Sequence, residues 1–123
     1  MSEQQIEKAI QDKGLNAPRL TPDDIDSAIV DEYYFTAKDG VVGGMDGYNA
    51  MGFHESLKTL TFCVLILKNG FKVVGQSDCA SPENFDAEIG KKVAKEDARY
   101  KVWMLEGYLL KEKLHQAELD SKF

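Results

Sequence analysis

The segment from Cys79 to Asp86 contains residue types that could bind a phosphate-bearing ligand. It is expected to leave a strand and enter a helix, and the amide groups at the start of a helix suit an anion. Asn84 carries both a donor and an acceptor, which can read the edge of a base. Phe71 and Phe85 offer flat faces against which a base can stack. Together these residues predict a nucleotide-binding site.

Basic side chains that could pair with phosphate lie mainly after this segment, in a chain whose formal net charge is −6. The lysines are most frequent at Lys91, Lys92, Lys95 and Lys101. We expect Arg99, Lys101 and Arg19 to contact the phosphates. A competing interpretation stays open, in which Ser81 only caps a helix, Phe85 lies in the core and the lysines form a solvated face.

Residues for catalysis or metal binding do not form a recognisable set. Neither His54 nor His115 has a cysteine or a second histidine at metal-ligand spacing. The acidic run 23–26 lacks the glycine and distal glutamate of a calcium loop. The numerous acids leave a glycosidase-like carboxylate pair open. We predict that the chain is not an enzyme and that it has no cofactor and no metal.

Local signals predict a single α+β domain over residues 1–123, with a small antiparallel sheet, short N-terminal helices and a long C-terminal helix. A helix is expected from Ser2 to Lys13, because Ser2 can cap it and Gly14 can end it. Thr21-Pro22 is typical of a second helix start. The aromatic run within Glu32–Thr36 predicts a strand.

The clearest local signal is a β-hairpin. Thr59–Leu67 alternates, with Leu60, Phe62, Val64 and Ile66 on one face. Phe71–Ser77 returns after a turn at Lys68-Asn69-Gly70. Asn69 and Gly70 both tolerate positive φ, which favours a tight turn.

Two further segments carry weaker signals. Residues 40–52 hold half of the ten glycines, which predicts a mobile loop or an elaborated hairpin connection, and they lack the Gly-Lys-Ser/Thr ending of a P-loop. The long helix is expected to begin at the Ser81-Pro82 cap and to kink or break between Trp103 and Gly107. Its apolar stripe Val102, Leu105 and Leu109 predicts a homo-oligomer.

Overall composition narrows the class of protein. An acidic chain repels DNA, RNA and anionic lipid, so we expect no nucleic-acid polymer and no membrane as partner. No apolar run reaches membrane-spanning length, and the start lacks an export signal, which predicts a cytoplasmic protein. The two cysteines, Cys63 and Cys79, are interpreted as reduced packing residues.

The chain also resembles a family of short tailed-phage and prophage proteins of long-unassigned function. The resemblance lies in Leu15 to Pro22, the hairpin Leu67 to Phe71, the block Cys79 to Gly90, and Trp103 to Leu110. Family members often have proline where this chain has Met104, and they usually lack a loop as long as residues 40–52.

The chain is also similar to the phage anti-Thoeris sponge proteins. Those proteins sequester cyclic ADP-ribose isomers made by bacterial TIR-domain defence enzymes, and some hold cyclic oligonucleotides of the CBASS system. This resemblance implies a dimer or a higher oligomer such as a hexamer, working in the cytoplasm of the bacterial host without cleaving its ligand. An alternative stays open, in which an acidic phage protein inhibits a host protein or serves as an accessory by binding it.

Overall fold

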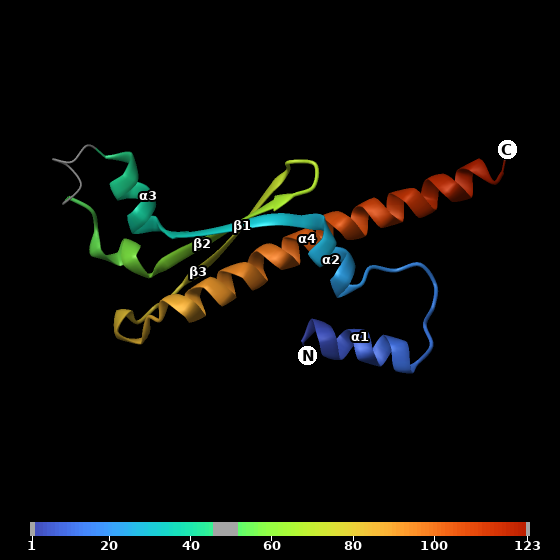
Figure 1. Cartoon of the computed structure of the whole chain (residues 1–123), viewed down its shortest axis with the longest axis horizontal. Coiled ribbons are helices and arrows are strands. Elements are labelled where there is room, and N and C mark those ends of the chain that lie inside the picture. Colours follow the sequence, from blue (N-terminus) through green and yellow to red (C-terminus); the bar gives the residue numbers. More distant parts are fainter. Residues whose placement is uncertain (1, 46–51, 123) are drawn as a thin grey trace. The chain divides into compact units, whose positions relative to one another are not determined.

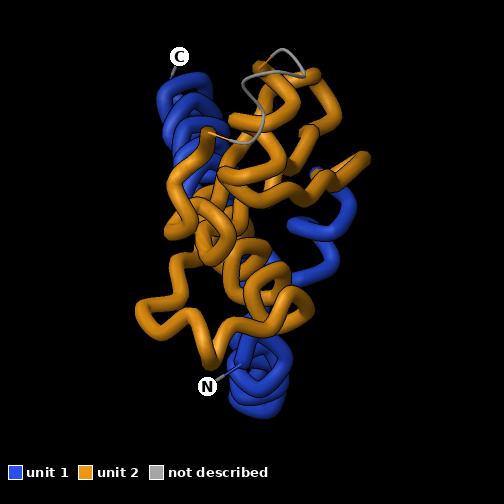
Figure 2. Tube along the Cα trace, turned by 90° about the vertical axis from the view of Figure 1, so that its left-hand side faces the viewer, with its two compact units in different colours: residues 1–28, 102–123 blue, residues 29–101 orange. Residues whose placement is uncertain are grey.

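The computed structural model describes residues 2–45 and 52–122. Its elements in chain order are α1 (Glu3–Asp12), α2 (Pro22–Ala28), β1 (Ile29–Thr36), α3 (Ala37–Gly44), η2 (Glu55–Thr59), β2 (Leu60–Leu67), β3 (Lys72–Asp78), η3 (Pro82–Asn84) and α4 (Ala87–Asp120) (Figure 1). This confirms the α+β class, the short N-terminal helices and the long C-terminal helix. Contacts divide the chain into two compact units, residues 1–28 with 102–123 and residues 29–101 (Figure 2). The single domain stays a prediction.

In the first unit, α1 begins and ends where the sequence predicts. The Ser2 hydroxyl accepts a hydrogen bond from the Gln5 amide at 3.2 Å, and the Gln5 side chain accepts one from the Ser2 amide at 2.8 Å. These reciprocal bonds satisfy two amides that the helix itself leaves unpaired. Gly14 follows the helix with φ of +64°, a conformation that glycine adopts without strain.

The start of α2 is also set by its own first residues. The Thr21 hydroxyl accepts from the Asp24 amide at 3.2 Å, and the Asp24 carboxylate accepts from the Thr21 amide at 2.9 Å. Pro22 takes the first helical position, where no amide hydrogen is needed. Ile25 is completely buried and anchors this short helix in the core of the unit.

The second unit contains a three-stranded antiparallel sheet in the order β1-β2-β3. The predicted hairpin is confirmed, but its turn differs in detail. Gly70 has φ of +86°, and no other residue type has a positive φ within the described ranges. Asn69 therefore does not adopt positive φ, and its side chain instead accepts from the Phe71 amide at 3.0 Å. The geometry is a three-residue loop in which only glycine takes the left-handed position.

One face of this sheet packs on the first part of α4. Cys63, Leu65 and Val73 are buried on the sheet side, and Ala94 and Ala98 are fully buried on the helix. The contact is so close that a Cβ on Gly75 would overlap the backbone of the two alanines. Small residues on both elements let a helix and a strand pack backbone against backbone.

We call the other side of the sheet the open face. The strand register places on it Asp31, Tyr33, Phe35, Leu60, Phe62, Val64, Ile66, Lys72, Val74, Gln76 and Asp78. The alternation predicted for β2 is therefore confirmed, but the buried half is the one containing Cys63 and Leu65. The more uniformly apolar half of β2 lies on the open face, where its residues are only half-buried.

Of the two alternatives predicted for residues 40–52, the elaborated hairpin connection is confirmed for the described part, because the segment joins β1 to its antiparallel neighbour β2. The mobile loop is wrong for residues 40–44. Residues 37–44 form α3, because Thr36 and Asp39 make a reciprocal cap: the Thr36 hydroxyl accepts at 3.1 Å and the Asp39 carboxylate at 2.9 Å. These cap bonds outweigh the low helix propensity of the three glycines within α3. The remainder of the predicted loop falls largely on residues 46–51, outside the described residues.

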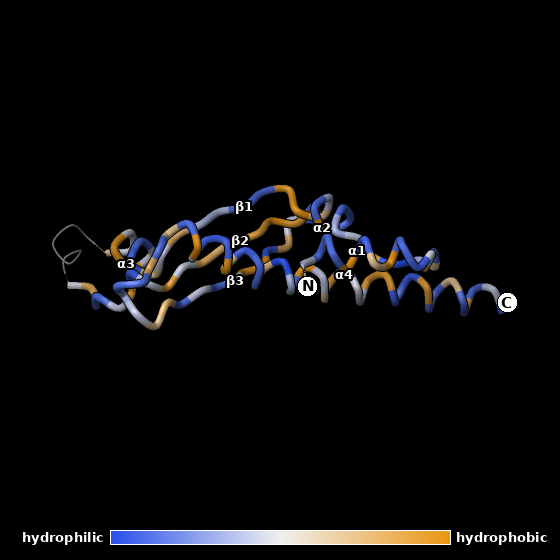
Figure 3. Tube along the Cα trace, turned by 90° about the horizontal axis from the view of Figure 1, so that it is seen from below, coloured by the Kyte–Doolittle hydropathy of each residue, from blue (hydrophilic) through white to orange (hydrophobic). Residues whose placement is uncertain are grey.

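Two expectations for the long helix are also corrected. The helix begins at Ala87, since Ser81 makes no capping bond and η3 is a separate short turn. Asp86 caps it instead, accepting from the Ile89 amide at 3.0 Å. The helix then continues without a break through Gly107, with its turns alternating between apolar and polar residues (Figure 3). Glycine costs about 1 kcal/mol inside a helix, which is small over 34 residues.

Candidate functional site

The helix start that carries Asn84 and Phe85 is less open to an anion than the sequence predicts. Asn84 is exposed, but Phe85 is half-buried, with its ring 3.4 Å from where a Cβ on Gly90 would lie. The Asp86 carboxylate already satisfies a first-turn amide of α4. Glu88 adds a second negative charge in the same turn. A phosphate arriving here would meet acidic side chains at the positive end of the helix.

Behind this turn lies a polar atom that makes no hydrogen bond. The Thr61 hydroxyl has none within the described part of the chain, and the residue is only 3% exposed. It lies on the sheet face that packs on α4, 2.9 Å from the Cβ position of Gly90. The hydroxyl is covered because Gly90, which has no side chain, lets α4 approach the strand closely. A larger residue at position 90 would clash with the hydroxyl.

A different group of predicted residues meets at the turn end of the hairpin. Phe71 is 56% exposed there, directly after the turn. The Lys101 ammonium comes from α4 and donates to the carbonyl of Val74, three residues after Phe71, at 2.6 Å. Lys68 and Lys72 flank the turn. We call Lys68, Phe71, Lys72 and Lys101 the hairpin-end cluster.

Lys68 and Lys72 were not singled out by the sequence reasoning, which looked for basic residues near the helix. The available signal was their position on either side of the Asn-Gly turn. Lys72 also donates to the Gly70 carbonyl at 3.2 Å, so its ammonium is held at the turn. The cluster therefore combines an accessible aromatic ring with three positive charges in an acidic protein.

The predicted residues do not form one site within a single chain. The seven residues of β3 lie between Phe71 and Cys79 and separate them by about 26 Å, at roughly 3.3 Å for each of the eight steps. Phe71 precedes one end of the strand, whereas Asn84 and Phe85 follow its other end. Lys101 contacts Val74, near the middle of the strand.

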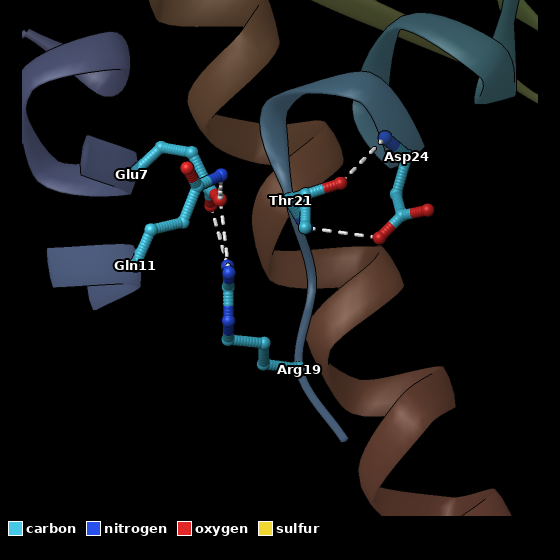
Figure 4. Close-up of polar contacts among 5 residues, drawn as sticks. All are labelled: Glu7, Gln11, Arg19, Thr21 and Asp24. Carbon is cyan, nitrogen blue, oxygen red and sulfur yellow. Dashed lines mark hydrogen bonds and ion pairs between the residues drawn. The ribbon is translucent and has the colours of Figure 1, made fainter. Parts of the chain in front are cut away.

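The two arginines belong to different compact units of the chain. Arg99 and Lys101 are two positions apart on α4, and such residues point to different sides of a helix. Arg19 belongs to the first unit, where its guanidinium makes two bonds to the Glu7 carboxylate, one of them 2.8 Å long (Figure 4). Gln11 donates to the same carboxylate at 2.6 Å. The hydrogen bond from Arg19 lowers the pKa of Glu7, so this pair is charged at neutral pH.

Several other basic and reactive groups serve the packing of α4 on the sheet. Lys95 pairs with Glu32 at 2.8 Å, and Lys91 lies over the ring of Tyr34 at 6.0 Å from its centre. Burial raises the pKa of the Cys63 thiol. The hydrogen bond between Cys63 and Tyr34 lowers that pKa by a smaller amount. Because the thiolate is the nucleophilic form, this buried cysteine is chemically inert.

The described ranges contain no group of three or more metal-ligating side chains. They likewise contain no helix that is both long and apolar enough to cross a membrane. That the chain is not an enzyme, and which partners it binds, stay predictions.

Comparison with known proteins identifies the family. A model of the phage protein family described as N4 Gp49/phage Sf6 gene 66 matches residues 20–114. The chain belongs to this family. The resemblance to phage proteins is thereby confirmed, whereas the narrower one to anti-Thoeris proteins stays a hypothesis. Neither the curated proteins nor the solved structures yield a match.

The matched part of this N4 Gp49/phage Sf6 gene 66 family member contains the whole sheet and most of α4. The hairpin-end cluster lies inside it, as do Asn84 and Phe85. Arg19 lies just outside it.

Proposed function

We propose that this phage protein binds a cyclic nucleotide immune signal in the bacterial cytoplasm and withholds it without cleaving it. The observation that carries the proposal is the hairpin-end cluster, in which an exposed Phe71 adjoins a turn flanked by Lys68 and Lys72 and Lys101 contacts the same strand at Val74. The ligand class is a cyclic ADP-ribose isomer, with cyclic oligonucleotides as a second class. Membership of a phage protein family supports the setting.

Each part of the cluster has a chemical role in this proposal. Phe71 stacks on an adenine base, a contact worth about 1–3 kcal/mol. The ammonium group of Lys101 pairs with the diphosphate, at roughly 1.5–3 kcal/mol for a charge-assisted bond. Lys101 retains donor capacity for this role, because an ammonium has three hydrogens and the Val74 carbonyl accepts only one.

Tight affinity follows only if the cluster is held in place before the ligand arrives. A dissociation constant of 1 nM corresponds to about −12 kcal/mol, so contacts of this size must lose little to ordering. Two features supply that order. The Asn69 side chain fixes the turn by accepting from the Phe71 amide, and Lys101 is tethered to the strand.

Withholding rather than cleavage is proposed because the chemistry near the cluster is that of binding. Its members are a phenylalanine and lysines that make hydrogen bonds to backbone carbonyls. The Asp97 carboxylate lies 3.7 Å from the Lys101 ammonium and accepts a hydrogen bond from the Gln76 amide. That carboxylate is therefore occupied in positioning the lysine.

Asn84, Phe85, Arg99 and Arg19 stay predicted ligand contacts with a smaller part in this proposal. Asn84 and Phe85 lie beyond the far end of β3, so a mononucleotide-sized ligand at the cluster does not reach them in the same chain. Arg19 would first have to leave Glu7.

Calorimetry with cyclic ADP-ribose isomers and cyclic trinucleotides tests the proposal. We expect binding to the wild type, and a loss of roughly tenfold or more in affinity for Phe71→Ala, which removes the stack. Tyr108→Ala is the matched control, because Tyr108 is an even more exposed aromatic residue outside the cluster. Mass spectrometry after denaturation should recover the ligand intact.

Three results would contradict this function. One is no heat with any of these ligands, and another is recovery of cleavage products. The third is an equal loss of affinity in Phe71→Ala and Tyr108→Ala. A stoichiometric host protein captured by a chain that binds no nucleotide would support the alternative of a protein–protein inhibitor instead.

A further inference from the structure

The open face of the sheet is rich in aromatic and aliphatic side chains, as protein surfaces that are covered by a partner are. Tyr33, Phe35 and Val74 on it are 56%, 39% and 43% exposed. Between them lie the half-buried side chains of Phe62, Val64 and Ile66. The rings of Phe35 and Phe62 are in contact, with their centres 5.3 Å apart.

A sheet that faces water on one side normally alternates between apolar residues toward the core and polar residues toward solvent. The centre of the open face departs from this pattern, because the β2 residues on it are apolar: Leu60, Phe62, Val64 and Ile66. Contiguous apolar surface rimmed by polar residues marks an interaction site. Aromatic residues are enriched in such interfaces.

The charges at the rim indicate what covers this surface. Lys72 lies at the turn end of β3 and Asp78 at the other end, both on the open face. The third charged residue of this face, Asp31 on β1, accepts a hydrogen bond from the Tyr33 hydroxyl of the same chain. Consider a two-fold axis that lies between two such sheets and crosses the middle of β3 at right angles. It would reverse the strand direction in the second copy and place each lysine opposite an aspartate of the other copy. Along β3 the charges are thus complementary to those of a second copy, as an isologous interface requires.

The position of α3 selects this antiparallel arrangement. A Cβ on Gly40 would lie 3.6 Å from the Phe35 ring, so α3 packs at the Phe35 end of the open face. Two copies with parallel strands would bring both α3 helices to the same end, where they would collide. With antiparallel strands, each α3 meets the hairpin end of the other copy.

We infer that a second copy of this chain docks on the open face, sheet against sheet with antiparallel strands. Val74 and Tyr33 lie in the interface, and Lys72 pairs with Asp78 of the partner subunit. This interface differs from the one predicted from the sequence on the C-terminal helix. The Val102 of that predicted stripe is completely buried within the chain.

Light scattering during size-exclusion chromatography tests this with a matched pair of variants. Val74 on the open face and Val93 on α4 are 43% and 44% exposed. We expect a wild-type dimer at micromolar concentration. Val74→Asp should raise the dimer dissociation constant roughly 100-fold, since it would bury an unpaired carboxylate. Val93→Asp should leave the dimer unchanged.

Charge reversal tests the antiparallel arrangement. Lys72→Glu and Asp78→Lys should each weaken the dimer roughly tenfold by placing like charges together, and the double variant should recover it. Asp78 accepts from the Thr59 hydroxyl at 3.1 Å, so circular dichroism melting checks that the single variants stay folded. Failure of the double variant to recover a folded dimer overturns the antiparallel arrangement.

A wild-type monomer at micromolar concentration overturns the inference and leaves the open face for another protein. Dissociation by Val93→Asp together with an intact dimer in Val74→Asp overturns it in favour of an interface on α4. Both results are independent of ligand binding, so they are distinguishable from failure of the proposed function.

Discussion

Lys101 on α4 donates a hydrogen bond of 2.6 Å to the backbone carbonyl of Val74 on β3. Asp97, one helical turn earlier, accepts from the Gln76 amide at 2.9 Å. β3 is an edge strand, and these are backbone groups that β2 does not use. Two side chains of one helix thus satisfy the outer edge of the sheet, which removes a template for unwanted strand pairing.

Replacing Lys101 by methionine is expected to destabilise the protein by about 1 kcal/mol. A bond from a charged donor is worth roughly 1.5–3 kcal/mol, reduced here because the side chain is about half exposed. Urea unfolding followed by circular dichroism measures the change. Lys92→Met is the control, since Lys92 is an exposed lysine on the same helix. Equal stability of the two variants would contradict the role of Lys101 at the edge.

Gly75→Ala should have a larger effect on the free energy of unfolding. The added methyl group would overlap the backbone of Ala94 and Ala98, so α4 must move away from the sheet. Overpacking of this kind costs about 1–3 kcal/mol, and the rigid backbone on both sides places Gly75→Ala at the upper end.

The control for Gly75→Ala is Gly43→Ala. Nothing lies within 4 Å of a Cβ at Gly43, which is in α3. Alanine should stabilise that helix by about 0.5–1 kcal/mol, because glycine loses more backbone entropy on folding. Thermal melting of both variants should therefore show shifts of opposite sign, and a normal melting temperature for Gly75→Ala would disprove the close packing.

The Glu7–Arg19 pair predicts a specific dependence of stability on pH. Hydrogen bonding to Arg19 holds the pKa of Glu7 below its ordinary value of 4.5. The folded-state pKa is thus lower than the unfolded one, so the stabilisation is complete above the ordinary pKa. It is lost as pH falls through the lowered value.

Glu7→Gln should therefore lower the melting temperature at neutral pH and have a smaller effect in acid, below the pKa of Glu7. Differential scanning calorimetry at several pH values measures the difference from the wild type. Glu112→Gln is the control, because Glu112 is an exposed carboxylate on α4. A difference for Glu7→Gln that stays constant across this range would show that the carboxylate is not stabilised by Arg19.

Much of the local structure could be predicted because its causes lie within a few residues. The Ser2 cap, the Thr21-Pro22 start and the Asn69-Gly70 turn each form from neighbours in the chain. The errors at α3 and at the start of α4 have a shared origin. In both, an aspartate makes the cap, Asp39 with Thr36 and Asp86 alone, and the sequence reasoning gave more weight to glycine and to Ser81.

The candidate site was predicted only in part. Phe71 and Lys101 could be identified by type, because an aromatic ring and a cation are what a nucleotide requires. The contact of Lys101 with the strand that follows Phe71 could not be predicted, since it depends on α4 running along β3. Asn84 lies beyond the far end of the strand, because the extended β3 separates it from Phe71 although the two are only thirteen positions apart in the sequence.

By itself, the sequence determined which segments are helices and strands wherever caps, turns and alternation act over short distances. It also showed that the sheet has two faces. Only the tertiary structure decided which face α4 covers, because that choice depends on Gly75 meeting Ala94 and Ala98. Contacts between residues so far apart in the chain cannot be read from periodicity, which repeats every two residues on either face alike.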